Sequence, residues 1–242
     1  MNQINKIIEQ KVINYHKDFA KKDKWNNLYF RIKQKILNKY LNKNYNVLDI
    51  GIGHWNHALQ ISDKVRFIYW IDISPDMIKI LKDKIEKNNI NNIKIILGNI
   101  LDTNIVKGLK DRIDLVYSFS TLYYIDDIDK LLSNLYLIWH SKTIYILEFV
   151  NKYSFTYYFS KKFFDIPQFG YSKRFLMYKF KNKGFKILKI YYFDLIPFLF
   201  RKKLIEKILS LNLFWHYLDE LLSSIPVINF FSGKFIFILK KK

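Results

Sequence analysis

The sequence predicts a single α/β domain with a mostly parallel β-sheet and helices on both faces. From residue 46 to residue 150, short and almost entirely apolar segments alternate with amphipathic helical ones. This pattern is typical of a parallel sheet that is buried on both faces. Two long apolar segments end the chain, and we expect them to pair antiparallel at one edge of the sheet. A length of 242 residues fits one such domain with an appendage.

Five strands are expected in the first 150 residues, with helices before and between them. The strands fall at residues 46–50, 65–72, 93–97, 114–120 and 142–150, and the helices at residues 4–13, 28–41, 54–62, 74–89 and 127–139. The helix at 74–89 is the best marked of these. Ser74 can cap its N-terminus, Pro75 fits its first position, and lysines gather toward its end.

The part of the chain after residue 150 follows a different order. The helix Lys173–Asn182 leads through Gly184 into the strand Phe185–Phe193, and Lys234–Lys241 is the last strand. With the five earlier strands, these two give a seven-stranded sheet. We therefore expect one domain over 1–242, with N-terminal helices in 1–44, a core in 45–150, and a final region in 151–242 that holds an insert at about 194–232.

Composition excludes several classes of protein. Half of the residues are hydrophobic and 18% are aromatic, so the chain is neither disordered nor of low complexity. It has no cysteine, which excludes disulfide frameworks, thiolate nucleophiles and cysteine-ligated metal sites, and we expect no metal site. The net charge of +20 either favours anionic partners or reflects lysines scattered along the whole chain. No segment has the roughly 20 apolar residues of a spanning helix, and no secretory signal is visible, so we expect the cytoplasm.

A glycine-rich turn follows the first strand, in the run VLDIGIGHWNHAL from Val47 to Leu59. A nucleotide-like ligand commonly binds where a strand of an α/β sheet passes through such a turn into a helix, because glycines let it approach the backbone closely. Asp72 ends the second strand about 20 residues after Gly51, the spacing at which a carboxylate accepts hydrogen bonds from both ribose hydroxyls. These features together predict a cofactor site.

The run D-x-G-x-G from Asp49 to Gly53 resembles motif I of the class I S-adenosylmethionine-dependent methyltransferases. Dinucleotide-binding loops differ, because their third glycine would fall at Asn56 and they rarely carry an acid where Asp49 stands. Three further segments are similar to the motifs of that family and occur in the same order. These are WIDIS at 70–74, LGNILD at 97–102 and DLVYSFSTLYYIDDI at 114–128. The resemblance covers about residues 15–150, and the final strands match the family's closing hairpin.

The resemblance implies a Rossmann-like fold, S-adenosylmethionine as cofactor, and methyl transfer as the reaction. It makes residues 45–150 the cofactor-binding core and 151–242 the substrate-side region. Asp72 would bind the ribose, Asn99 would accept a hydrogen bond from the adenine amino group, and the backbone amide of Ile100 would face the ring. The strand end at Ser118 would meet the methionine part. The cofactor-binding residues that the resemblance implies are Asp49, Gly51, Gly53, Asp72, Ile73, Asn99, Ile100 and Ser118.

Two positions depart from the family's pattern. Trp55 stands where a third glycine is common, and its indole either crowds the methionine part or floors a substrate pocket. Asn99 replaces the more usual aspartate, although an amide oxygen still accepts a hydrogen bond. His54, His57 and Tyr123 lie near the expected mouth of the site. We assign no catalytic residue, because methyl transfer depends mainly on positioning and needs a base only for some nucleophiles.

The insert at about 194–232 combines apolar and basic side chains. The apolar run Phe198–Phe200 directly precedes the basic run Arg201–Lys203. This order suits a substrate lid or a helix that lies on an anionic membrane surface, and a helix packed on the sheet edge is an equal alternative.

We therefore expect a cytoplasmic enzyme, with peripheral contact to an anionic membrane left open, that methylates oxygen or nitrogen of a small or lipid-like acceptor. A non-catalytic binding module with the same fold is one alternative, based on Trp55. An RNA methyltransferase is another, favoured only by the charge. Nucleic acid is the less favoured partner, since 118–121 reads SFST in place of the [DN]-P-P-[YF] motif of amino-methylating nucleic-acid enzymes.

Overall fold

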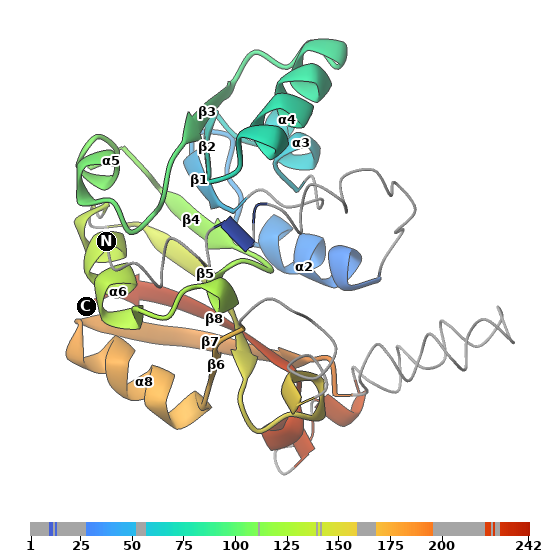
Figure 1. Ribbon diagram of the computed structural model, residues 1–242, viewed down its shortest axis with the longest axis vertical. Helices are drawn as coiled ribbons and strands as arrows, with labels where there is room; N and C mark the ends of the chain where they lie inside the picture. The colour runs from blue at the N-terminus through green and yellow to red at the C-terminus, as the bar shows by residue number, and fades with distance from the viewer. Residues whose placement is uncertain are drawn as a thin grey trace, which may run out of the picture.

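A single mixed β-sheet lies at the centre of the protein, with helices packed on both of its faces (Figure 1). The computed structural model describes residues 10, 11, 13, 28–51, 57–110, 112–138, 140, 142–158, 168–195, 221–223, 225 and 228–242. The strands are β1 (Asn46–Ile50), β2 (Phe67–Asp72), β3 (Ile93–Leu97), β4 (Leu115–Ser118), β5 (Ile144–Asn151), β6 (Gly170–Tyr171), β7 (Phe185–Phe193) and β8 (Lys234–Lys241).

The helices between these strands are short to medium in length. The α-helices are α2 (Leu28–Asn38), α3 (His57–Ile61), α4 (Pro75–Lys87), α5 (Thr103–Lys107), α6 (Ile128–Leu137) and α8 (Lys173–Asn182). Single 3-10 turns occur at η1 (Ser62–Lys64), η2 (Leu122–Tyr124) and η4 (Ile228–Phe231). The expected helix at 4–13 lies almost entirely outside the described residues, as does the first part of the one at 54–62.

The strand order confirms the predicted mostly parallel, Rossmann-like sheet. The main path runs β3-β2-β1-β4-β5-β8-β7. Strands β1 to β5 pair parallel with one another, whereas β8 lies antiparallel to both β5 and β7. The prediction of seven strands was one short, because β6 also pairs with the end of β5. A strand of two residues is too short to produce an alternating pattern in the sequence.

Successive side chains of a strand point to opposite faces of the sheet, so the strands contribute to two separate hydrophobic cores, one on each face. On one face, Leu48 of β1 and Val116 of β4 pack with side chains of α5, α6 and α8. On the other face, Val47 of β1 and Trp70 of β2 pack with side chains of α2, α3 and α4. Figure 1 shows the two groups of helices on opposite sides of the sheet.

Local sequence signals determine where several elements begin and end. Ser74 caps α4 as predicted, since its hydroxyl accepts a hydrogen bond from the backbone N–H of Met77 at 3.3 Å. Asp127 caps the N-terminus of α6, since its carboxylate accepts a hydrogen bond from the backbone N–H of Lys130 at 2.8 Å. The strand expected at 114–120 ends at Ser118, because Ser120 has a φ of +57° and turns the chain out of the sheet.

None of the helices in the described ranges is both long enough and apolar enough to cross a lipid bilayer.

Candidate cofactor and acceptor site

The carboxyl ends of β3, β2, β1 and β4 lie next to one another, and hydrogen bonds join them. The backbone N–H of Gly98, after β3, donates to the carbonyl of Asp72 in β2 at 2.8 Å. The hydroxyl of Ser118 in β4 donates to the carbonyl of Ile50 in β1 at 2.8 Å. The strand order reverses between β1 and β4, which is the place where open α/β sheets bind their ligands. The structure thus brings the described members of the predicted cofactor set to one edge.

Residue 51 must be a glycine in this fold. Its φ is +76°, and a Cβ built there would overlap the side chain of Thr121. The hydroxyl of Thr121 donates to the carbonyl of Gly51 at 3.2 Å, so the turn after β1 is packed against the turn after β4. The second glycine of the motif, Gly53, lies outside the described residues together with His54 and Trp55.

Asp49 supports the end of β1 from inside the protein. It is buried, and its carboxylate accepts a hydrogen bond from the hydroxyl of Tyr117 at 2.6 Å. Burial raises the pKa of Asp49 well above its ordinary value, and nearby Asp72 raises it further, against the opposing effect of the Tyr117 hydrogen bond. These contacts make Asp49 a support of the β1–β4 junction, and its contact with the cofactor stays a prediction.

Asp72 is the last residue of β2, and its carboxylate is fixed by the next turn. Its Oδ1 accepts a hydrogen bond from the backbone N–H of Ser74 at 2.7 Å, just before α4. The side chains of Asp72 and Ile73 are partly exposed, unlike the neighbouring core residues. A carboxylate held in this way can accept hydrogen bonds from a ribose, and that contact stays a prediction.

The turn after β3 presents one amide side chain and one backbone N–H. Oδ1 of Asn99 accepts from the N–H of Leu101 at 2.8 Å, so one lone pair of the oxygen predicted to meet adenine is already used. The side chain of Asn134 donates to the carbonyl of Ile100 at 2.8 Å and holds the turn. Ile100 is buried, and its own N–H has no acceptor among the residues that the structure describes.

Ser118 has a structural role in this arrangement. Its side chain is fully buried and its hydroxyl is used in the bond to Ile50 described above. Only the main chain of this strand end is left for the methionine part of a cofactor, and that contact stays a prediction.

A buried cluster of charges lies where α2 meets β5 and β8, and the sequence analysis did not find it. The ammonium of Lys33 lies 2.6 Å from Oε2 of Glu148, and the ammonium of Lys234 lies 3.1 Å from Oε1 of the same residue. Lys33 also donates to the hydroxyl of Ser120 at 2.7 Å. Asp194 is buried beside both lysines.

Burial acts differently on the three ion-paired groups of this cluster. It is the largest influence on Lys33 and lowers its pKa to about 8, in spite of Glu148. Burial is the largest single influence on Glu148 and Lys234 as well, but the attractions of their neighbours together outweigh it. Lys234 and Lys33 lower the pKa of Glu148, and Glu148 and Asp194 raise that of Lys234. Glu148 and Lys234 are therefore ionised at neutral pH, and Lys33 can lose its proton near pH 8.

The histidine described near this edge is a packing residue. His57 is buried, its ring stacks on Phe30 with the centroids 4.2 Å apart, and its Nδ1 is 2.7 Å from Oε1 of Gln34. Burial lowers the pKa of His57 well below its ordinary value, and Lys33 adds to this effect. The ring is accordingly neutral at neutral pH and is enclosed by α2.

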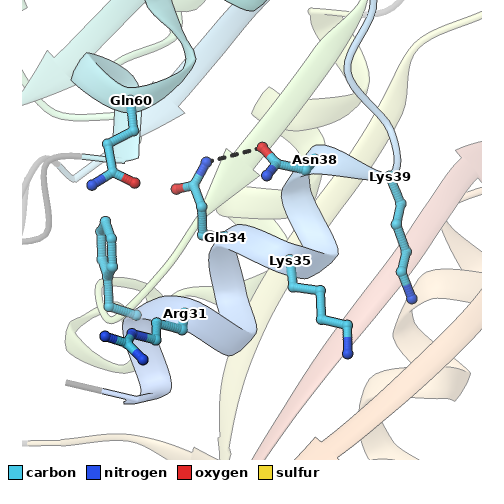
Figure 2. A pocket seen from close by; sticks show the side chains of 7 residues that line it. Arg31, Gln34, Lys35, Asn38, Lys39 and Gln60 are labelled. Atoms are coloured by element: carbon cyan, nitrogen blue, oxygen red, sulfur yellow. Dashed lines mark hydrogen bonds between the residues drawn. The ribbon is translucent and has the colours of Figure 1, made fainter.

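A groove of about 430 Å³ lies between α2 and α3, separate from the sheet edge. Figure 2 shows Arg31 and Lys35 along α2 and Lys39 just after it, with Gln34 hydrogen-bonded to Asn38 at 3.1 Å. None of the residues predicted to bind the cofactor lines this groove. In the described ranges, no cluster of three or more histidines and carboxylates could hold a metal ion.

Comparison with known proteins identifies the family. The family described as "Methyltransferase domain" matches residues 41–183, which is more than half of the chain. The chain belongs to this family. The prediction of an S-adenosylmethionine-dependent methyltransferase is confirmed at this level.

One protein of similar sequence and one solved structure of similar fold show how far the similarity extends. The methyltransferase is 26% identical over 202 residues to malonyl-[acyl-carrier protein] O-methyltransferase 1 of Ilyobacter polytropus, covering 75% of this chain and 69% of the relative. Its fold is similar to that of an S-adenosylmethionine-dependent methyltransferase from Archaeoglobus fulgidus, with a TM-score of 0.62, 19% identity, and 88% and 94% of the two chains covered.

A third protein of similar fold is phosphoethanolamine N-methyltransferase 2 of Haemonchus contortus, solved with phosphomonomethylethanolamine and S-adenosylhomocysteine. The TM-score is 0.64 at 16% identity, over 88% of this chain and 52% of the other. The methyltransferase thus spans about half the length of that enzyme. At this identity the likeness supports the fold alone.

The sheet edge fits S-adenosylmethionine as cofactor. The turn at Gly51 brings the chain, at a φ of +76°, from the end of β1 to the carboxyl edge of the sheet, packed against Thr121. A fixed carboxylate at Asp72 and the unpaired N–H of Ile100 supply an acceptor and a donor for the ribose and the adenine. These three groups lie on the ends of β1, β2 and β3 and would hold the adenosine end.

Proposed function

We propose that the enzyme methylates an oxygen, that of a carboxylate, on a small or lipid-like acyl acceptor. The observation that carries this proposal is the similarity to an enzyme named as an O-methyltransferase of malonyl-[acyl-carrier protein], which extends over three quarters of the chain. Nitrogen is the competing acceptor atom. The fold is similar to that of a phosphoethanolamine N-methyltransferase, so the fold alone does not choose between the two atoms.

The chemistry of a carboxylate suits the groups at the site. When bound, the cofactor supplies a methyl carbon on a sulfonium; the bond to the acceptor oxygen forms as the carbon–sulfur bond breaks, and sulfur keeps that electron pair. A carboxylate is already ionised at neutral pH, so the protein has no proton to remove. An ammonium acceptor would first have to lose a proton, and His57, buried and engaged by Gln34, is poorly placed to take it.

The chain's own contribution is to position the two reactants. Asp72 and Ile100 would hold the adenosine end over β2 and β3. The acceptor would then approach over β4, β5 and β8, where Ser120 and the charge cluster around Glu148 lie. Holding two reactants in line supplies much of the rate of such a displacement.

A methylation assay with a carboxylate probe tests the proposed function. The full chain would be incubated with methyl-tritiated S-adenosylmethionine and either malonyl-N-acetylcysteamine or phosphoethanolamine. A methyl ester releases volatile tritiated methanol after mild base, whereas an N-methyl group is stable. We expect base-labile label from the malonyl thioester only, and much less of it from Asp72→Ala. Label that is stable to base, or that appears only with phosphoethanolamine, would contradict a carboxylate acceptor.

We also propose that the acceptor side of the enzyme contacts an anionic membrane surface. Aromatic side chains on two described segments are exposed, namely Tyr153 and Phe155 after β5, and Phe230 and Phe231 in η4, at the end of the insert. The rings of Tyr153 and Phe230 stack with their centroids 5.5 Å apart, and the ammonium of Lys152 lies 4.9 Å from the Tyr153 ring centre. Exposed aromatic rings beside basic groups favour the interface between lipid headgroups and acyl chains.

Co-sedimentation with vesicles tests the membrane contact. The basic run Arg201–Lys203 and the apolar run before it lie outside the described residues, so they enter from the sequence alone. Each basic residue near an anionic surface contributes on the order of 1 kcal/mol to binding. We expect binding to vesicles with anionic lipid that weakens as salt rises, and loss of most of it when all three basic residues become glutamine. If the wild-type protein stays in the supernatant at low salt, the membrane contact is contradicted. The insert would then be a substrate lid or a helix packed on the sheet edge.

The two other candidate functions predict different results. A non-catalytic module that is blocked at Trp55 would not bind S-adenosylhomocysteine in a calorimetric titration. An RNA methyltransferase would shift RNA in a gel, with a steep fall of affinity as salt rises.

A further inference from the structure

One serine at the carboxyl edge of the sheet has a hydroxyl proton that none of the described residues accepts. Ser120 follows the end of β4, is partly buried, and has a φ of +57°, a conformation that serine seldom adopts. Its oxygen accepts a hydrogen bond from the ammonium of Lys33 at 2.7 Å. Among the described residues, nothing accepts a bond from this hydroxyl in return.

The lysine that fixes this serine is held rigidly. The side chain of Lys33 is 3% exposed, and its ammonium lies 2.6 Å from Glu148 and over the rings of Phe119 and Phe193, at 5.7 and 5.9 Å from their centroids. Lys33 is an ammonium with donors only, so it must occupy a lone pair of the Ser120 oxygen. The hydroxyl proton of Ser120 is therefore turned away from Lys33.

Burying the charged cluster around Glu148 lowers the stability of the folded protein. Removing charges from water is energetically unfavourable, and well-packed apolar side chains would often stabilise a protein as well or better. Strained or destabilising groups that persist in a fold tend to gather at functional sites. Here they gather beside the predicted methyl-transfer site.

Ser120 lies on the acceptor side of that site. Its neighbour Thr121 donates to the carbonyl of Gly51, which places the serine directly beside the glycine turn. The groups that would hold adenosine, Asp72 and Ile100, extend from β2 and β3 on one side of that turn, whereas β4 leads toward β5 and β8 on the other. Ser120 thus lies on the β4 side of the glycine turn, and Asp72 and Ile100 lie on the other side.

We propose that Ser120 donates a hydrogen bond to an oxygen of the methyl acceptor, and that Lys33, fixed by Glu148, is the positioning residue that directs the proton of Ser120 toward it. The inference rests on the proposed function for the nature of that oxygen, which is one oxygen of the acceptor carboxylate. Bonding one carboxylate oxygen to the protein would leave the other free to attack the methyl carbon. Ser120 thereby selects acceptors that carry such an oxygen.

The absence of cysteine offers a direct test, because Ser120→Cys introduces a single thiol. The variant would be alkylated with iodoacetamide alone, with S-adenosylhomocysteine, and with S-adenosylhomocysteine plus malonyl-N-acetylcysteamine. We expect the thiol to react, S-adenosylhomocysteine to change the rate less than twofold, and the malonyl probe to slow it about tenfold. Ser133→Cys is the matched control. Ser133 also accepts from a lysine, Lys183, at 2.8 Å, but it uses its proton on the carbonyl of Asp129 and lies on α6.

A second set of variants tests hydrogen bonding and the role of Lys33. Ser120→Ala should lose about tenfold in affinity for the malonyl probe with S-adenosylhomocysteine present, and less than twofold in affinity for S-adenosylhomocysteine itself. Adding Lys33→Met to Ser120→Cys should slow alkylation at pH 7.5, because a nearby ammonium stabilises the thiolate. An unchanged rate would remove Lys33 from the proposal.

Three results would overturn the assignment of Ser120. These are a thiol that does not react, a thiol that S-adenosylhomocysteine alone protects, and unchanged affinity of Ser120→Ala for a probe that the wild type binds. A wild-type protein that does not bind the malonyl probe contradicts the carboxylate acceptor instead. In that case the alkylation rates with and without S-adenosylhomocysteine still decide on which side of the site Ser120 lies.

Discussion

Replacing Lys33 with methionine should make the protein more stable at neutral pH. Burial lowers the pKa of Lys33 from an ordinary 10.5 to about 8. Since one pKa unit corresponds to about 1.4 kcal/mol, holding the ammonium inside costs the folded state about 3 kcal/mol. Lys33→Met removes this charge and keeps an unbranched chain, while losing the hydrogen bond to Ser120, worth about 1 kcal/mol. We expect a net gain of about 2 kcal/mol at pH 7.

The gain should depend on pH in a defined direction. Below pH 8 Lys33 is protonated in both the folded and the unfolded chain, so the full cost is present. Between pH 8 and 10.5 the unfolded state binds more protons than the folded state, and wild-type stability rises with pH relative to the variant. The difference between the two proteins should therefore shrink from pH 8 upward.

Urea denaturation of both proteins at pH 7, 8, 9 and 10 measures this difference. Lys183→Met is a suitable control, since it also breaks a lysine–serine hydrogen bond but at a partly exposed site. Removing one member of a buried ion pair commonly destabilises by about 3–5 kcal/mol, because the other charge is left alone. Glu148 keeps Lys234 at 3.1 Å, so we expect no such loss. A variant destabilised by that amount at pH 7, or a difference that is constant with pH, would refute the reasoning.

Four further predictions concern the cofactor side of the site. Asp72→Ala should weaken S-adenosylhomocysteine binding by about 1.5–3 kcal/mol in calorimetry, with an unchanged circular dichroism spectrum; unchanged affinity in the folded variant would remove the ribose assignment. Gly51→Ala should abolish that binding and lower the melting temperature, because the new methyl group meets Thr121 at a φ of +76°, and a variant that binds normally would show that the turn can relax. Trp55→Gly should keep near wild-type affinity for S-adenosylhomocysteine and alter acceptor turnover, whereas a large gain in affinity would show that the native turn is obstructed. Asn134→Ala should cost about 1–3 kcal/mol in urea denaturation, since it leaves the carbonyl of Ile100 without its donor, and a smaller loss would mean that water replaces it.

The strands could be predicted because each is an apolar run, and the residues that follow most of these runs favour a turn or a helix start. β1, β3, β7 and β8 have the predicted ends, and α4 starts at the predicted cap. The ends of β4 and β5 were harder to predict. At β4 the chain leaves the sheet through Ser120, which has a positive φ and accepts a hydrogen bond from Lys33, and no local pattern reveals either feature.

The buried charges could not be assigned from the sequence, although it contains a trace of them. Lys33 lies on the same face of its helix as the buried residues Ile36 and Leu37, and Glu148 interrupts an otherwise apolar strand. Each of these positions is unusual for a charge. Their pairing depends on how α2 is placed against β5, which is a tertiary feature that periodicity does not encode.

The position of β8 between β5 and β7 has a consequence for the order in which the sheet can form. β5 ends at Asn151, and one of its two edges pairs with β4. Its other edge stays unpaired until β8, Lys234–Lys241, has been synthesised. During synthesis, a nascent chain that contains β7 but not yet β8 would carry β5 and β7 as two separate strands with unpaired edges, both rich in aromatic and β-branched residues. Such edges are templates for association between chains, and contacts between distant segments form slowly. Completion of the sheet is thus expected to be a late and vulnerable step, in which chaperone capture of nascent chains would be greatest before residue 234 emerges.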